Sequence, residues 1–88
     1  MDIKEIVKNA KEYFSEMFSD RIYDNIILLE EVELLADNKW KITLGFYEKK
    51  VNNQPFAGIA FLENNLTKAY KILFVDEKGK VEKIKNYD

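Results

Sequence analysis

Apolar side chains recur at every third or fourth position from Ile3 to Phe18, and charged or polar side chains fill most positions between them. This spacing predicts an amphipathic helix over about residues 2–19. Asp2 is well placed to cap the first turn, with Glu5 three residues later as in a capping box.

From Ile26 onward the apolar period shortens to two, which predicts strands. A first strand ending near Ala36 and a second beginning at Trp40 form a hairpin over the loop 37–39. A two-residue turn is rejected, because it would turn one apolar face toward water. The favoured loop places four apolar residues on one face: Val32, Leu34, Ile42 and Leu44.

The C-terminal residues predict a second hairpin, with strands over about 69–76 and 80–86. The loop is Glu77-Lys78-Gly79, with Gly79 where a positive φ is needed. Residues 48–66, between the hairpins, form an irregular connection. The register of the second hairpin gives two facing pairs: Val75 with Val81, and Ile72 with Ile84.

One helix followed by antiparallel strands predicts an α+β fold, in which one N-terminal helix packs on a four-stranded antiparallel sheet made of two hairpins. A chain of 88 residues is large enough for a single core, so residues 1–88 are expected to form one domain.

The strand at 69–76 is apolar on both faces. One face carries Ala69, Leu73 and Val75 with Val81, and the other carries Tyr70, Ile72 and Phe74 with Ile84. A single helix covers only one face, so the other must be covered by residues 56–62, by another subunit or by a ligand. The leading hypothesis is a non-enzymatic protein-interaction domain that forms a homodimer. Its predicted contact residues are Phe56, Ile59, Phe61, Tyr70, Ile72 and Phe74.

The amino-acid composition excludes several kinds of catalytic and metal-binding site. The chain has no His and no Cys, which excludes disulfides, thiol nucleophiles and the usual nitrogen and sulfur ligands of zinc, and removes the commonest catalytic base. A net charge of −2 gives no reason to expect a nucleic-acid or membrane partner. We expect no cofactor. Because no long apolar run marks a signal or a membrane span, a cytoplasmic location is expected, with a trimmed secreted domain as the alternative.

Charge is distributed unevenly along the chain. Residues 1–38 hold 4 basic and 10 acidic side chains, and residues 39–88 hold 10 and 6, so the two parts carry −6 and +4. The favoured interpretation is weak attraction within one fold. The other is association between unlike patches of two molecules.

The densest acidic cluster comprises Glu30, Glu31, Glu33 and Asp37. It lacks the spacing of a calcium loop, so no metal site is predicted. An unbroken strand would point Glu30 at the core. A β-bulge at Glu30-Glu31, or a strand that begins later, would release it, and these alternatives are favoured. The rival function is a small-molecule or weakly catalytic cleft between helix and sheet, formed by Tyr13, Tyr70 and Glu30.

The last strand is basic, with Lys78, Lys80, Lys83 and Lys85 in or beside it. Contact with phosphate is possible in principle, but no aromatic residue alternates with these lysines. Protection of a free sheet edge against aggregation is the favoured role.

The run Trp40-Lys41-Ile42-Thr43-Leu44, followed by Tyr70-Lys71-Ile72, Val75-Asp76, Gly79 and Val81, resembles the PepSY-like group of small domains. The resemblance covers the C-terminal half. It implies a helix paired with an antiparallel sheet, and a role in modulating peptidases or binding partner proteins. It carries over no active-site residue, and the apolar positions from Tyr70 to Val75 are denser than strict alternation.

Overall fold

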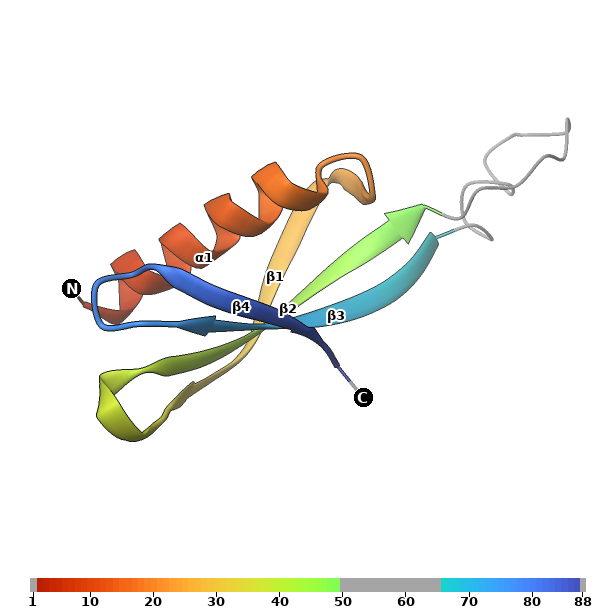
Figure 1. Cartoon of the computed structure of the whole chain (residues 1–88). Coiled ribbons are helices and arrows are strands. Elements are labelled where there is room, and N and C mark those ends of the chain that lie inside the picture. Colours follow the sequence, from red (N-terminus) through yellow and green to blue (C-terminus); the bar gives the residue numbers. More distant parts are fainter. Residues whose placement is uncertain (1, 50–65, 88) are drawn as a thin grey trace, which may run out of the picture.

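The computed structural model describes residues 2–49 and 66–87. These residues form one helix, α1 (Ile3–Phe18), and four strands, β1 (Ile22–Leu34), β2 (Trp40–Lys49), β3 (Leu66–Val75) and β4 (Val81–Asn86). The strands form one antiparallel sheet in the order β1-β2-β3-β4, and α1 lies across one of its faces (Figure 1). The predicted α+β architecture is confirmed.

The helix follows its sequence pattern closely. The Asp2 carboxylate accepts a hydrogen bond of 3.0 Å from the N–H of Glu5, which satisfies one of the free donors of the first turn. Ile6, Ala10 and Phe14, spaced by four residues, are the buried residues of α1. The predicted bounds differ from the observed ones by one residue at each end.

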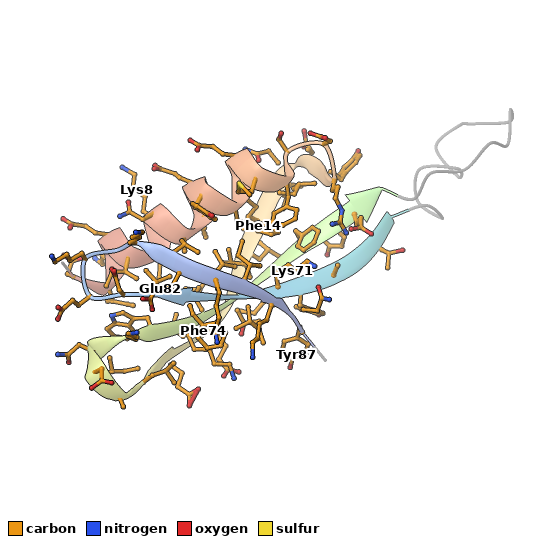
Figure 2. All side chains as sticks on the ribbon, in the orientation of Figure 1. Lys8, Phe14, Lys71, Phe74, Glu82 and Tyr87 are labelled. Atoms are coloured by element: carbon orange, nitrogen blue, oxygen red, sulfur yellow. The ribbon has the colours of Figure 1, made fainter. Side chains whose placement is uncertain are left out.

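The core lies between α1 and the sheet face beneath it, here called the helix face. Phe14 is fully buried and contacts Phe46 edge to face, with ring centroids 5.0 Å apart. In Figure 2 its side chain lies between helix and sheet. The other buried residues of β2 and β3 on this face are Ile42, Leu44, Leu73 and Val75. The opposite face is here called the far face.

The first hairpin turns through a longer loop than predicted. Leu34 pairs with Trp40, so the loop spans residues 35–39 and contains a short 3-10 turn, η1 (Ala36–Asn38). Ala36 therefore belongs to the loop and not to the strand. Asp37 and Asn38 both have a positive φ, at 64° and 58°, which these residue types tolerate well. The register differs from the predicted one by an even number of residues, so Val32 stays on the helix face, opposite Ile42.

Strand β1 starts at Ile22, earlier than the predicted start at Ile26, and it is irregular. Its register shifts between Ile22 and Ile27 and again between Leu29 and Glu31. Alternation predicted the strand itself but not its first residues, because each shift changes which side chains face the core.

The turn of the second hairpin agrees with the prediction. Gly79 has φ 86°, a conformation that favours glycine, and Val75 pairs with Val81. The Asp76 carboxylate accepts the N–H groups of Lys78 and Lys80, each at 2.9 Å. These hydrogen bonds stabilise the ionised carboxylate, chiefly through Lys80, and lower the pKa of Asp76.

The predicted pairing of Ile72 with Ile84 is wrong. The register shifts by one residue beyond Val75, so Ile84 lies opposite Leu73. Glu82 is the extra residue of this bulge. The bulge lets both Val81 and Ile84 pack against the core, so Ile84 belongs to the helix face and not to the far face.

Most of the predicted connection 48–66 lies outside the described residues, including the predicted contact residues Phe56, Ile59 and Phe61. Its predicted ends are wrong, because Glu48 and Lys49 belong to β2 and Leu66 belongs to β3. Within the described part of the chain, no helix is long and apolar enough to cross a membrane.

Candidate functional site

The far face is built from cross-strand rows that run from β1 to β4. Each row takes one outward residue from each strand that it crosses, because side chains alternate between the two faces. The row nearest the hairpin tips contains Glu33, Lys41, Phe74 and Lys83. The next contains Glu31, Thr43, Ile72 and Lys85. The third contains Leu28, Gly45 and Tyr70.

An apolar strip follows β3 along the middle of the far face. It consists of Tyr70, Ile72 and Phe74, which confirms that these residues share the face opposite the helix. Ile72 and Phe74 are half-buried, and Tyr70 is 36% exposed. The Tyr87 ring packs on Tyr70 with centroids 5.3 Å apart, and Figure 2 shows Phe74 and Tyr87 on the side of the sheet away from α1. No helix or strand of the described chain covers this strip.

Lysine side chains screen the apolar strip. The Lys83 ammonium lies 4.7 Å from the centre of the Phe74 ring, and that of Lys85 lies 5.9 Å from it. The Lys68 ammonium lies 5.3 Å from the centre of the Tyr70 ring. Long lysine stems shield apolar surface while their charged ends stay in water, and each exposed cation-π contact contributes about 0.5–1 kcal/mol. This cover is a set of movable side chains and not a packed layer.

Glu30 lies on the far face because β1 bulges between Leu29 and Glu31, as favoured from the sequence. Its side chain crosses Gly45, where a Cβ atom would come within 3.0 Å of the Glu30 Cγ. The carboxylate then reaches the Lys68 ammonium at 3.2 Å. This hydrogen bond, reinforced by the charge of Glu30, raises the pKa of Lys68. Glu30 is therefore an exposed ion-pair partner and not a buried acid.

The charges on the far face are sorted by strand. Edge strand β1 contributes Glu30, Glu31 and Glu33, whereas edge strand β4 contributes Lys83 and Lys85. Three inter-strand spacings of about 4.8 Å separate these two edges by about 14 Å. The far face thus has an acidic edge, a basic edge, and a centre where the apolar strip lies beside Lys41 and Lys68.

The cleft predicted from Tyr13, Tyr70 and Glu30 does not form. Tyr13 lies on α1, whereas Tyr70 and Glu30 lie on the far face, so the sheet separates them. Tyr70 and Glu30 are brought together only through Lys68, which contacts both.

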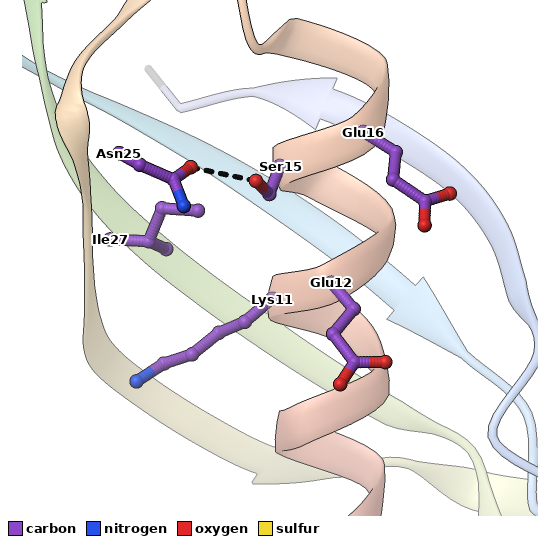
Figure 3. Close-up of a pocket in the computed structure, with 6 residues that line it drawn as sticks. All are labelled: Lys11, Glu12, Ser15, Glu16, Asn25 and Ile27. Atoms are coloured by element: carbon purple, nitrogen blue, oxygen red, sulfur yellow. Dashed lines mark hydrogen bonds between the residues drawn. The ribbon is translucent and has the colours of Figure 1, made fainter.

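A hollow of about 360 Å³ does lie between α1 and β1, at the first irregularity of the strand (Figure 3). Asp24 and Asn25 both have φ 52° there, and the Ser15 hydroxyl donates a 2.7 Å hydrogen bond to Asn25 Oδ1. Sequence reasoning missed this site; the signal was the Asp-Asn pair, whose residues tolerate positive φ. The hollow is lined by Lys11, Glu12, Ser15, Glu16, Asn25 and Ile27.

A second hollow, of about 410 Å³, lies between the two hairpin tips. Leu34 and Trp40 line it with Asn38, Glu77 and Lys78. Leu34 is 57% exposed, because this part of the helix face extends beyond the cover of α1.

The acidic edge does not converge on a metal site. Among residues 2–49 and 66–87, no group of three potential ligands of the carboxylate, His or Cys type comes together. Comparison of the chain with protein-family models, with curated proteins and with solved structures finds no match. The PepSY-like resemblance therefore stays a prediction.

Proposed function

We propose that this chain is a small, non-enzymatic protein-interaction domain of the cytoplasm that associates with a second copy of itself through the far face. The observation that carries the proposal is the strip of Tyr70, Ile72 and Phe74, which lies on the face opposite the only helix of the described residues. Exposed apolar strips with polar rims are typical of protein-binding surfaces.

The size of the face supports a weak dimer. Four strands spaced by about 4.8 Å, and a ten-residue β3 that rises about 3.4 Å per residue, outline roughly 600 Å². Two such faces bury roughly 1,200 Å² together, which is the lower limit of specific interfaces. We therefore expect reversible association, with a dissociation constant in the micromolar range or weaker.

The non-enzymatic part of the proposal rests on composition. A chain without His and Cys lacks the commonest general base and the most reactive nucleophile. On the far face, the carboxylate of Glu30 is already paired with Lys68. The PepSY-like resemblance, with its implied role in binding partner proteins, points the same way.

Sedimentation equilibrium over a wide range of protein concentrations tests the proposal. We expect the wild type to self-associate and Phe74→Lys to stay monomeric at concentrations where the wild type is dimeric. Met17→Lys is the matched control, because Met17 is an exposed apolar residue on α1, at 59% exposure. A wild type that is monomeric at millimolar concentration would overturn the proposal, and so would an unchanged dissociation constant in Phe74→Lys.

One observation favours a second function, small-molecule binding in the hollow between α1 and β1. The left-handed backbone at Asp24 and Asn25 holds a side-chain amide against Ser15 at the wall of that hollow. Convergent polar groups in a concave site are typical of ligand binding. NMR titration with small amides and carboxylic acids tests this: saturable shifts at Ser15 and Asn25, lost in Asn25→Ala, support it, and no saturable shift contradicts it.

A further inference from the structure

The far face is complementary to itself in only one of two symmetric arrangements. Two copies that pack face to face keep their strands aligned to within about 30°. A two-fold axis parallel to the strands places β1 of one copy over β4 of the other. An in-plane axis perpendicular to the strands places β1 over β1. Because β1 is acidic and β4 is basic on this face, the first arrangement pairs opposite charges and the second pairs like charges.

We infer that the second copy docks with the two-fold axis parallel to the strands; this inference rests on the proposed self-association and specifies its geometry. The axis passes between β2 and β3, the two central strands. Each row of the far face then packs against the same row of the second copy, with its residues in the opposite strand order. Glu33 faces Lys83 of the second copy, and Glu31 faces Lys85 of the second copy.

The centre of the rows also matches. Lys41 faces Phe74 of the second copy, which places a cation over an aromatic ring. Thr43 lies opposite Ile72 of the second copy, but at 3% exposure it offers almost no surface for contact. The apolar strip on β3 of each copy therefore lies over β2 of the other, so both strips are covered at once.

Docking of a second copy is expected to draw Lys83 and Lys85 away from the Phe74 ring that they cover in the single chain. In the single chain, the Lys83 and Lys85 ammonium groups lie 4.7 Å and 5.9 Å from the centre of the Phe74 ring. Carboxylates of the second copy offer these cations stronger partners than an aromatic ring does. When the lysines turn toward Glu31 and Glu33 of the second copy, Phe74 is freed for contact.

Cysteine cross-linking tests the axis directly, because the natural chain contains no Cys. Facing sheets lie about 10 Å apart, so a bismaleimide of about that reach joins facing positions. We expect an equal mixture of Glu33→Cys and Lys83→Cys chains to give at least fivefold more cross-linked dimer than either variant alone. Lys8→Cys, on the exposed surface of α1, should not cross-link with either variant. Preferential cross-linking of Glu33→Cys with itself would overturn the axis.

Charge reversal gives an independent test by sedimentation equilibrium. Glu31→Lys with Glu33→Lys should weaken self-association at least tenfold. Adding Lys83→Glu and Lys85→Glu to the same chain should restore it to within threefold of the wild type. Failure to restore it, in a variant whose circular dichroism and thermal unfolding match the wild type, would overturn the inferred axis. If the wild type dimerises and Phe74→Lys does not, the proposed function still stands in that case. A monomeric wild type removes both.

Discussion

Truncation of Phe14 tests the central packing contact, because the helix covers the helix face chiefly through this side chain. Phe14 is fully buried, with ring centroids 4.9 Å from Phe18 and 5.0 Å from Phe46. Phe14→Ala removes this ring and leaves a cavity between helix and sheet. Comparable truncations cost about 3–5 kcal/mol. A domain of 88 residues has a free energy of unfolding of about 4–13 kcal/mol, so the loss is a large part of the total.

Urea denaturation followed by fluorescence and circular dichroism measures this loss. Trp40, the only tryptophan, packs against the core and should report its exposure. Because Phe14→Ala could unfold a marginal domain, Phe14→Leu provides a milder variant, which should cost less than Phe14→Ala because it removes fewer buried atoms. Tyr13→Ala is the control on the same helix, since Tyr13 is 38% exposed and should cost under about 1 kcal/mol.

The relative losses of unfolding free energy in these variants show whether Phe14 is the main packing contact of the helix. Phe74→Ala should cost less than Phe14→Ala, because Phe74 lies half-buried under lysines on the far face. If Phe14→Ala lost no more stability than Tyr13→Ala, the helix would not pack on the sheet through this residue. The distinction between helix face and far face would then fail.

Further predictions concern the turns and the helix cap. Gly79→Ala should lower the free energy of unfolding by about 1–2 kcal/mol, because a Cβ atom strains a residue at φ 86°; an unchanged urea midpoint would contradict this. Asp76→Ala should destabilise the domain at pH 7. The pKa of Asp76 is lowered by folding, so its contribution is present above its ordinary value of 3.8 and is lost as pH falls through the lower folded value. The difference between wild type and Asp76→Ala should therefore narrow in acid, and a gap that widens there would refute the assignment. Asp2→Ala should cost about 0.5–2 kcal/mol by removing the cap hydrogen bond to Glu5, with a matching loss of helical circular dichroism.

Local patterns were sufficient for much of the fold. The four-residue spacing of Ile6, Ala10 and Phe14 is a property of the chain alone, and any helix formed from it has one apolar side. The turn at Gly79 was equally readable, because the positive φ there suits glycine. The presence of both apolar faces on β3 also followed from alternation, and Tyr70, Ile72 and Phe74 do share the far face.

The errors arose where a strand departs from strict alternation. The extra residue Glu82 moved Ile84 to the core. The bulge at Glu30, which the sequence favoured, moved that carboxylate out over Gly45. The break at Asp24 and Asn25 hid the first residues of β1 and created the hollow beside Ser15. A bulge changes the face of every residue beyond it, and its position depends on contacts across strands that a single segment does not encode.

The amino-acid sequence by itself determined the helix, the four strand-forming segments, the sharp turn at Gly79 and the surplus of apolar residues on β3. Only the tertiary structure decided that the acidic residues of β1 and the lysines of β4 line opposite edges of one face. The physical reason is that periodicity is a local property of the chain, whereas register and strand order arise from hydrogen bonds between segments far apart in sequence. The charged edges of the far face exist only once those segments are paired.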